Sequence, residues 1–366
     1  MRAAVFYEPN TPFIIEDIEL DPPGPGEALV KIAVSGVCHS DYHLVTGSTQ
    51  HPLPVVAGHE GAGVVEAVGP GVTRVRPGDH VVLSWVPTCG ECFYCQHGLP
   101  AQCEATIAPL WAGTLLDGTT RLSKNGQTIY HFSGLGTFAE YAVVPQLSCV
   151  PIRRDVPLTV AALVGCAVTT GIGAALNTAQ IRPGSSVVVF GCGGVGLNII
   201  QGAALAGATT IIAVDVVPAK MDLARQFGAT HMVNSREVDA QRAIEELTAG
   251  RGADYALEAS GVPAVQRLAY DAIRRGGTVT YVGIGPHDAV VPLPAGRLPR
   301  EDKTLKGSYY GGANPQRDMP MILDLYAAGR LKLDELISRR YPLAAINEAF
   351  AAMLSGEVAR GVIIFD

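Results

Sequence analysis

The chain has 366 residues, of which 48% are hydrophobic and 17% charged, which is too long for one ordinary domain and suits two buried cores. Its formal net charge is −7 and lysine and arginine form no basic run, which argues against a nucleic-acid partner. The first residues lack the apolar core of a signal peptide. We therefore expect a cytoplasmic globular protein that is not a membrane protein.

The first part of the chain, residues 1–167, is predicted to be rich in β-strands. Its short alternating runs of apolar and polar residues are separated by Pro, Gly and Asp turns. These runs cover 28–34, 63–68, 80–83 and 137–144.

From residue 168 to 309 the pattern changes to strands that alternate with helices. Such alternation predicts a parallel sheet covered by helices on both sides. The predicted strands are 187–190, 210–214, 231–233, 255–258 and 279–282, with a helix at 218–227. The tail, 310–366, is predicted to contain helices at 319–328 and 344–354 and a strand at 362–365.

Residues 185–217 are nearly uncharged and long enough to suggest a transmembrane helix. Their glycines divide them into two short β-branched runs around a Gly-rich turn and an Ala/Gly helix. Strands that are buried on both faces of a parallel sheet have this composition. We therefore predict a strand, a helix and a strand here, and no membrane span.

Four of the eight cysteines lie within 15 residues, in the spacing C-x2-C-x2-C-x7-C. Four thiolates at this spacing can surround one zinc ion with no open position, which predicts a structural site. An iron–sulfur cluster is an alternative, because its ligands also use C-x2-C pairs. The four residues are Cys89, Cys92, Cys95 and Cys103.

A glycine-rich loop, residues 191–196, has the pattern G-x-G-x-x-G between an apolar strand and a helix. These glycines let backbone N–H groups approach a pyrophosphate at the helix N-terminus. Asp215 ends the next strand, where a carboxylate would accept hydrogen bonds from the adenosine ribose and repel a 2′-phosphate. This arrangement predicts NAD rather than NADP.

The remaining metal-capable residues are weak signals separately and stronger together. They lie in Gly-Val-Cys-His-Ser-Asp-Tyr-His at 36–43, in Gly-His-Glu at 58–60 and in Gly-Cys at 165–166. The run G-H-E-x2-G-x5-G-x2-V at 58–72 resembles the signature of the zinc-containing medium-chain alcohol dehydrogenase family. The resemblance covers essentially the whole chain. It is closest to the liver-type subgroup, because residues 113–132 look like the insertion that is characteristic of that subgroup.

The resemblance implies a two-domain α/β fold. A GroES-like, β-rich catalytic domain would comprise 1–167 and 310–366, and a Rossmann domain with a doubly wound parallel sheet would comprise 168–309. It also implies a homodimer, with a tetramer as the alternative.

For the catalytic zinc, the resemblance implies the ligands Cys38, His59 and Cys166, with Glu60 as an occasional ligand. Two thiolates and an imidazole leave a fourth position open, and the zinc ion then acts as a Lewis acid on an alcohol oxygen. Asp41 would orient the ligand histidine. With the four-cysteine site, the chain would hold two zinc ions.

The resemblance also implies a proton relay, in which Ser40 passes the alcohol proton through the coenzyme ribose to His43. The nicotinamide ring would lie against Thr170 and Val195. His39 stands where many family members have an arginine. The coenzyme-binding residues would be His39, Thr170, Gly191, Gly193, Gly194, Val195, Gly196, Asp215, Lys220, Val282, Ile284, Tyr310 and Arg360.

Trp85 and Phe132 correspond to family positions that line the substrate pocket, and Leu110 would join Phe132 in keeping that pocket apolar. We therefore expect a zinc-dependent, NAD-linked enzyme that interconverts a primary alcohol with a hydrophobic or aromatic tail and its aldehyde. Cys149 and Cys192 have no place in this scheme, and we expect both to be small buried hydrophobic residues.

Two other functions stay open. One is a thiol-adduct formaldehyde dehydrogenase of the same fold. The stretch 47–51 has no acid, and Ile107 stands where an arginine would bind the carboxylates of glutathione, which leaves a mycothiol-type role open. The other is a non-enzymatic NAD-binding relative, which the two complete ligand sets disfavour.

Overall fold

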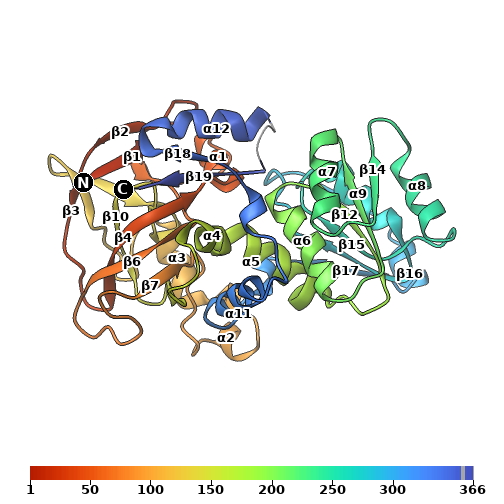
Figure 1. Ribbon diagram of the computed structural model, residues 1–366, viewed down its shortest axis with the longest axis horizontal. Coiled ribbons are helices and arrows are strands. Elements are labelled where there is room, and N and C mark those ends of the chain that lie inside the picture. Colours follow the sequence, from red (N-terminus) through yellow and green to blue (C-terminus); the bar gives the residue numbers. More distant parts are fainter. Residues whose placement is uncertain (356–358, 366) are drawn as a thin grey trace. The chain divides into compact units, whose positions relative to one another are not determined.

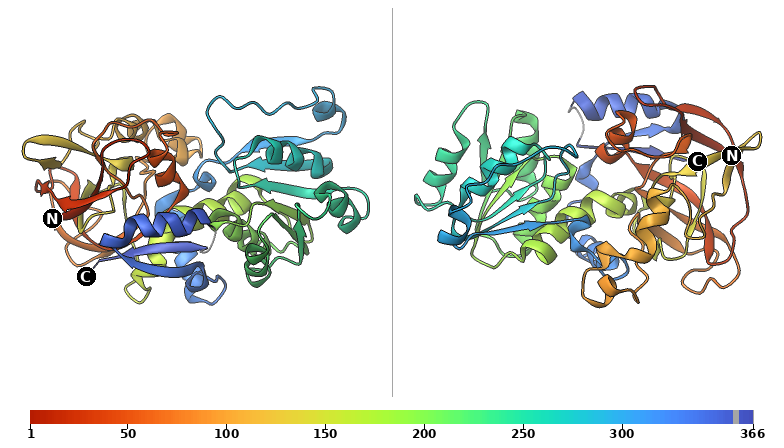
Figure 2. Two further views of the ribbon diagram at one scale, coloured as in Figure 1. Left: turned by 90° about the horizontal axis from the view of Figure 1, so that it is seen from above. Right: turned by 180° about the vertical axis from the view of Figure 1, so that it is seen from behind.

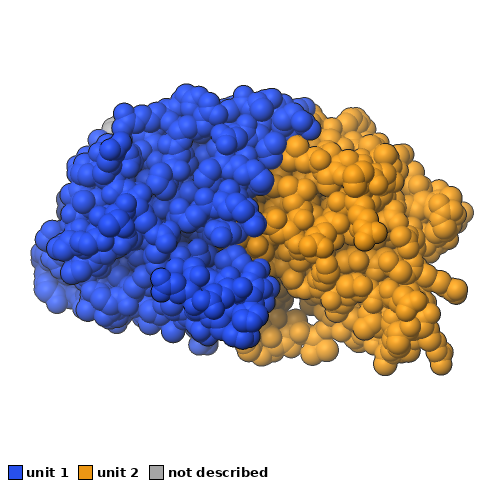
Figure 3. Space-filling model, turned by 90° about the horizontal axis from the view of Figure 1, so that it is seen from below, with its two compact units in different colours: residues 1–166, 314–366 blue, residues 167–313 orange. Residues whose placement is uncertain are grey.

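The structure, a computed structural model, describes residues 1–355 and 359–365. The chain divides into two compact units, which Figure 3 colours separately. Unit 1 comprises residues 1–166 and 314–366, and unit 2 comprises residues 167–313. The domain changes expected at 167/168 and 309/310 correspond to unit changes at 166/167 and 313/314.

Unit 1 is built on two antiparallel-rich sheets, with strand orders β2-β1-β5-β9-β8-β3 and β11-β7-β6-β4-β19-β18, and β10 also pairs with β4 (Figure 1). The long strand β4 (Glu27–Gly36) pairs with β6, β10 and β19, so the last strand of the chain lies beside the segment that leads to Cys38. The other strands are β1 (Arg2–Phe6), β2 (Ile14–Asp17), β3 (Glu19–Leu20), β5 (Val55–Val56), β6 (Gly61–Val68), β7 (His80–Leu83), β8 (Leu122–Lys124), β9 (Gln127–His131), β10 (Tyr141–Pro145), β11 (Cys149–Pro151), β18 (Ile337–Pro342) and β19 (Arg360–Ile364).

The helices of unit 1 are short and lie mostly beside or between the sheets. They are α1 (His39–Val45), α2 (Phe93–Gln96), α3 (Glu104–Trp111), α4 (Leu158–Leu163), α11 (Pro315–Ala327) and α12 (Ile346–Ser355). The strand predicted at 137–144 begins only at Tyr141. The chain turns at Gly136, whose φ is +69°. The N–H of Thr137 then donates to the Gly58 carbonyl and not to a neighbouring strand of the sheet.

Unit 2 is a six-stranded parallel sheet in the order β14-β13-β12-β15-β16-β17, with helices on both faces (Figure 2). This order confirms the predicted doubly wound sheet. The strands are β12 (Ser186–Phe190), β13 (Thr210–Asp215), β14 (His231–Asn234), β15 (Ala253–Glu258), β16 (Ile273–Tyr281) and β17 (Thr304–Gly307). The helices are α5 (Thr169–Gly173), α6 (Gly194–Leu205), α7 (Pro218–Gln226), α8 (Ala240–Leu247), α9 (Pro263–Ala272) and α10 (Arg297–Arg300).

The nearly uncharged segment 185–217 forms β12, α6 and β13, as predicted. Its strand β12 carries the run Val187–Phe190, whose four side chains are all buried because both faces of the sheet are covered. Among the described residues one helical segment, Leu158–Ala179, is long and apolar enough to cross a membrane. Its most apolar window is 89% buried within the protein, as in the core helix of a globular fold.

Candidate functional site

The four clustered cysteines form a compact lobe of unit 1. Their Sγ atoms lie within 4.8 Å of one another, and the Cys89–Cys95 and Cys92–Cys103 pairs are 4.0 and 3.9 Å apart. Four sulfurs about 2.3 Å from a central zinc ion would be separated by about 3.8 Å. Backbone N–H groups of Glu91 and Cys92 also point at the Cys89 sulfur, at 3.4 and 3.3 Å. The residues therefore fit one tetrahedral metal ion.

A second cluster in unit 1 brings Cys38, His59, Glu60 and Cys166 together, with one ligand atom of each within 4.8 Å of the others. All four residues are buried. Cys38 caps the N-terminus of α1, and His59 and Glu60 directly precede β6. Cys166 lies in a π-helical turn, Val164–Val168, a distortion that is frequent at functional sites.

A fixed hydrogen bond orients the histidine of this cluster. Its Nδ1 lies 3.0 Å from Oδ1 of the fully buried Asp41, which also accepts the N–H of Gly58 at 3.0 Å. Because Nδ1 donates to the carboxylate, Nε2 carries the lone pair. That Nε2 is buried and has no hydrogen-bond partner within the described part of the chain. A metal ion bound to the neighbouring thiolates would supply the missing partner.

Arg360 lies in the same cluster, where its guanidinium bonds to Oε2 of Glu60. Both side chains are buried, and burial raises the pKa of Glu60 to about 8 although the Arg360 charge opposes this. Gly36 leaves the space for this pair, since a Cβ there would lie 2.1 Å from Glu60 Oε2. Arg360 was expected at the coenzyme pyrophosphate, and its pairing with Glu60 was not foreseen.

The two relay candidates lie on α1. Ser40 Oγ is 3.8 Å from Cys38 Sγ, so the serine hydroxyl lies beside the cluster of Cys38, His59 and Cys166. His43 is half-buried and lies one helical turn after Ser40. Within the described structure the two side chains form no direct hydrogen bond. His39, at the first turn of the same helix, is exposed.

Aromatic rings flank His59. The Trp85 ring lies edge-on at 6.1 Å between centroids and the Phe132 ring at 5.7 Å. Leu110 is buried and packs at Gly134, two residues after Phe132, where an added Cβ would lie 2.2 Å from a Leu110 methyl group. The three residues predicted to line the pocket are therefore next to the cluster or next to one another. The His51 ring also contacts the Phe132 ring, at 5.5 Å between centroids, and no sequence pattern indicates this contact.

The glycine loop of unit 2 has the geometry of a phosphate-binding turn. Gly196 admits no side chain, because a Cβ would lie 1.8 Å from the Gly191 carbonyl oxygen. The corresponding space at Gly193 is open, as a close ligand requires. Asp215 accepts the N–H groups of Cys192 at 2.7 Å and of Val216 and Val217 at 2.7 and 3.0 Å, which fixes its carboxylate beside the loop.

The other coenzyme candidates of unit 2 lie on separate elements. Lys220 is on α7, Thr170 is on α5 and Val195 is on α6. Val282 is buried directly after β16, while Ile284 is 66% exposed. Tyr310 is buried in a left-handed conformation with φ of 52°.

The two leftover cysteines are both buried. Burial raises the pKa of the Cys149 thiol and of the Cys192 thiol to about 12. Both therefore stay protonated near neutral pH and behave as small apolar groups.

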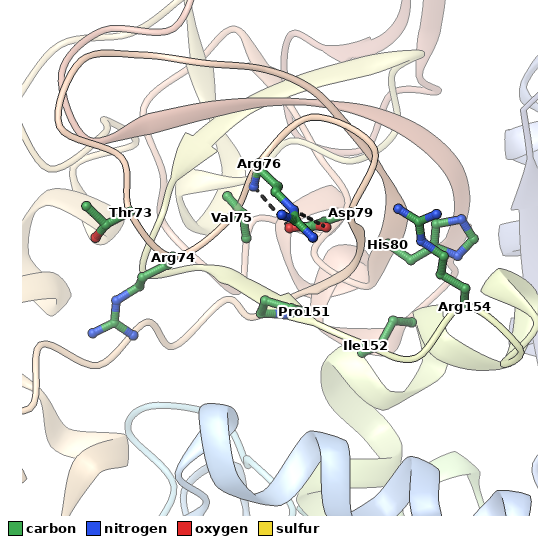
Figure 4. Close-up of a pocket in the computed structure, with 9 residues that line it drawn as sticks. All are labelled: Thr73, Arg74, Val75, Arg76, Asp79, His80, Pro151, Ile152 and Arg154. Carbon is green, nitrogen blue, oxygen red and sulfur yellow. Dashed lines mark hydrogen bonds and ion pairs between the residues drawn. The ribbon is translucent and has the colours of Figure 1, made fainter.

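Unit 1 also has a shallow hollow of about 360 Å³, drawn in Figure 4. No predicted site residue lines it, so it is not the expected substrate pocket. Its lining residues are Thr73, Arg74, Val75, Arg76, Asp79, His80, Pro151, Ile152 and Arg154.

Two family models match the chain. Residues 24–154 match the alcohol dehydrogenase GroES-like domain, and residues 194–328 match the zinc-binding dehydrogenase model. The chain is 44% identical to the NDMA-dependent alcohol dehydrogenase of Amycolatopsis methanolica, and the alignment covers 99% of this chain and 98% of that one.

Solved structures agree with these matches. The benzyl alcohol dehydrogenase of Acinetobacter calcoaceticus superposes with a TM-score of 0.95 at 34% identity, covering 100% of this chain and 99% of that one. A putative zinc-binding dehydrogenase of Sinorhizobium meliloti 1021, bound to NADP, has a TM-score of 0.80 at 27% identity, with coverage of 100% and 99%. The protein therefore belongs to the zinc-containing medium-chain alcohol dehydrogenase family of oxidoreductases.

Proposed function

We propose that the protein is a zinc-dependent, NAD-linked alcohol dehydrogenase that interconverts a primary alcohol with a hydrophobic or aromatic tail and its aldehyde. The observation that carries the proposal is the buried cluster of Cys38, His59 and Cys166, in which His59 Nε2 lacks a partner among the residues described. Two thiolates, an imidazole and flanking aromatic rings suit an open zinc site at the end of an apolar pocket.

In this proposal Cys38, His59 and Cys166 hold the catalytic zinc ion, and the four-cysteine lobe holds a structural one. When bound, the catalytic ion supplies a Lewis acid that lowers the pKa of an alcohol hydroxyl. Asp41 keeps His59 in the tautomer that exposes Nε2. The Arg360 guanidinium offsets the negative charge of the thiolates and holds Glu60, so that this carboxylate is a conditional ligand.

Ser40 is the group that takes up the alcohol proton while it gives up its own, since its hydroxyl lies 3.8 Å from Cys38 Sγ. His43 would release that proton to solvent, because an imidazole exchanges protons near neutral pH. NAD supplies the hydride acceptor. The fixed Asp215 carboxylate favours NAD over NADP, although one relative is bound to NADP.

Trp85, Leu110 and Phe132 give the pocket apolar walls, and the likeness to a benzyl alcohol dehydrogenase supports an aromatic alcohol. Ile107 lies on α3, one turn before Leu110, and adds no charge that could bind a thiol's carboxylates. A thiol-adduct formaldehyde dehydrogenase is therefore the second candidate. The NDMA-dependent relative makes NDMA a further candidate acceptor.

We also propose a cytoplasmic homodimer. Strand β17 pairs only with β16 in the described structure, so it leaves a sheet edge that a second copy could extend. Light scattering of the purified protein measures this directly, and a monomer at micromolar concentration would contradict the dimer.

The function is tested by steady-state kinetics combined with metal analysis. The assay uses benzylic, terpenoid and short and long aliphatic alcohols, each with NAD, NADP or NDMA, beside formaldehyde with and without low-molecular-weight thiols. We expect NAD-linked turnover of benzylic alcohols by wild type. Cys38→Ala should lose about 10³-fold or more in kcat and one zinc ion, yet retain NAD binding. Wild-type turnover by Cys38→Ala would contradict the catalytic-zinc assignment, and activity only with a thiol would favour the second candidate.

A further inference from the structure

The acid Glu258 has no role in the function proposed above, although it ends the strand beside the coenzyme loop. In the register of the sheet it pairs with Phe190, the last residue before the loop, on one side and with Tyr281 on the other. Strand order reverses next to β12, and ligands of doubly wound sheets bind at such a switch point. Glu258 is nevertheless fully buried, so it does not face solvent or a ligand directly.

Most of the hydrogen bonds to its side chain come from the turn that follows, and the Gln266 side chain on α9 also bonds to it. Oε1 accepts the N–H of Ser260 at 2.6 Å and the N–H of Gly261 at 3.0 Å, and the Ser260 hydroxyl bonds to the same oxygen. Oε2 lies 3.2 Å from the Gly261 N–H. A carboxylate can accept all of these bonds with its two oxygens. A glutamine at this position would replace one of those oxygens with an NH2 group, which is itself a donor and would face other donors.

The turn that Glu258 holds lies between the two parts of the predicted coenzyme site. On one side Ala259 donates to the Phe190 carbonyl at 2.9 Å, and a Cβ on Gly191 would lie 3.3 Å from Ser260 N. On the other side a Cβ on Gly283 would lie only 2.2 Å from Gly261 N. The backbones are therefore in direct contact on both sides of the turn.

The main chain of Glu258 completes the link. Its carbonyl oxygen accepts the N–H groups of Val282 and Gly283, at 2.8 and 2.9 Å. Val282 and Ile284 are expected to bind the coenzyme, and the Gly191 loop is expected beside the pyrophosphate. Glu258 and the turn after it are thus in contact both with the glycine loop and with residues 282–284.

We infer that Glu258 is a positioning residue for the coenzyme, which fixes the distance between the glycine loop and residues 282–284 through the turn Ser260–Gly261. This inference rests on the proposed function. Removing the charge would let the turn relax, so that the glycine loop and residues 282–284 no longer match one bound dinucleotide.

The test measures the Kd of NADH by fluorescence titration in Glu258→Gln, with thermal unfolding of the same samples. The matched control is Asp254→Asn, because Asp254 is the second residue of the same strand and accepts bonds from Ser186 and Arg274 at the opposite end of that strand. We expect Kd to rise about tenfold or more in Glu258→Gln, as loss of a charge-assisted bond would give. Asp254→Asn should lower the thermal midpoint yet change Kd less than about twofold.

An unchanged Kd in Glu258→Gln, or an equal rise in Asp254→Asn, would overturn the inference. If Glu258→Gln does not fold, Ser260→Ala removes one bond from the same turn and should raise Kd about threefold, and an unchanged Kd in this variant would again overturn it. Wild-type protein that binds no nicotinamide nucleotide would instead overturn the proposed function, and the inference with it.

Discussion

At the scale of single residues, the site combines charges whose positions are fixed by backbone hydrogen bonds. Asp41 is held by the Gly58 N–H and in turn holds His59. Asp215 is held by three backbone N–H groups at the carboxyl end of β13. A carboxylate fixed in this way keeps its charge in one place, so its effect on a ligand can be tested by substitution.

Replacing Asp215 should weaken the discrimination between coenzymes. Asp215→Gly removes the repulsion of a 2′-phosphate and the acceptor for the ribose hydroxyls, so the ratio of kcat/KM for NAD to that for NADP should fall about tenfold or more. Parallel assays with both coenzymes measure the ratio. Asp222→Asn, an exposed acid on α7, neutralises a charge in the same unit and should leave the ratio unchanged. An unchanged ratio in Asp215→Gly would refute the basis for predicting NAD.

At the scale of elements, the segment between β16 and β17 is anchored by charged groups. Glu301 bonds to Arg297 at 3.0 Å and to Lys303 at 3.1 Å. The Lys303 side chain is 1% exposed, and its ammonium lies 4.9 Å from the ring centroid of the buried Tyr270. Loss of Glu301 would leave this buried cation without its carboxylate partner, which is costly in a protein interior.

Glu301→Gln should therefore destabilise the protein in a pH-dependent way. Hydrogen bonds from Arg297 and Lys303 lower the pKa of Glu301 from 4.5 to about 2. A lowered folded-state pKa gives stability that is present above pH 4.5 and is lost as the pH falls toward 2. At pH 7 the variant should lose about 1–3 kcal/mol in urea unfolding, and the difference from wild type should shrink below pH 4.5.

The control for this prediction is Glu246→Gln. Glu246 pairs with Arg242 on α8, and both side chains are largely exposed. Such a pair contributes only about 0.3–0.5 kcal/mol, so this variant should unfold almost as wild type does. A Glu301→Gln protein as stable as Glu246→Gln at pH 7, or a difference that does not change with pH, would contradict the argument.

Much of the fold could be predicted because burial leaves a local pattern. The run Val187–Phe190 is β-branched and apolar because the strand is covered on both faces, and the structure forms β12 there. The π-helical turn that presents Cys166 could not be predicted, since no residue in Val164–Val168 marks a change of helical hydrogen bonding. The order of strands in unit 1 also depends on distant pairs such as β4 and β19.

In the candidate site, too, local patterns could be predicted, whereas groupings of residues that are far apart in the sequence could not. The four-cysteine lobe has a spacing that identifies a metal site, and its sulfurs converge as expected. Cys38, His59 and Cys166 are far apart in the sequence, and only the family resemblance grouped them. The family resemblance also implies that Arg360 lies at the pyrophosphate, and nothing in its local sequence indicates that β19 brings its guanidinium to Glu60.

At the scale of the whole molecule, we expect different ligands to stabilise the folded structure of the two units. The lobe 89–111 has little core of its own, because Phe93, Leu99 and Trp111 are 59%, 52% and 48% exposed. Such a segment needs a bound metal to fold, and metal-binding free energy then becomes folding free energy. Unit 2 instead has a buried apolar core around its parallel sheet and no metal-capable cysteine or histidine cluster in residues 167–313.

Hydrogen exchange measured by mass spectrometry tests this division. Removing zinc with a chelator should raise the exchange of backbone amides most strongly in 89–111, while peptides that cover β12 and β13 should change little. Adding NAD should protect residues 190–217 and 258–285, because a ligand that binds the native state stabilises the segments around it. Metal content measured on the same samples shows how many zinc ions per chain the chelator removed. Chelation that raises exchange equally in both units would show that metal binding orders the whole chain, and the assignment of the four-cysteine lobe as a local structural site would then be wrong.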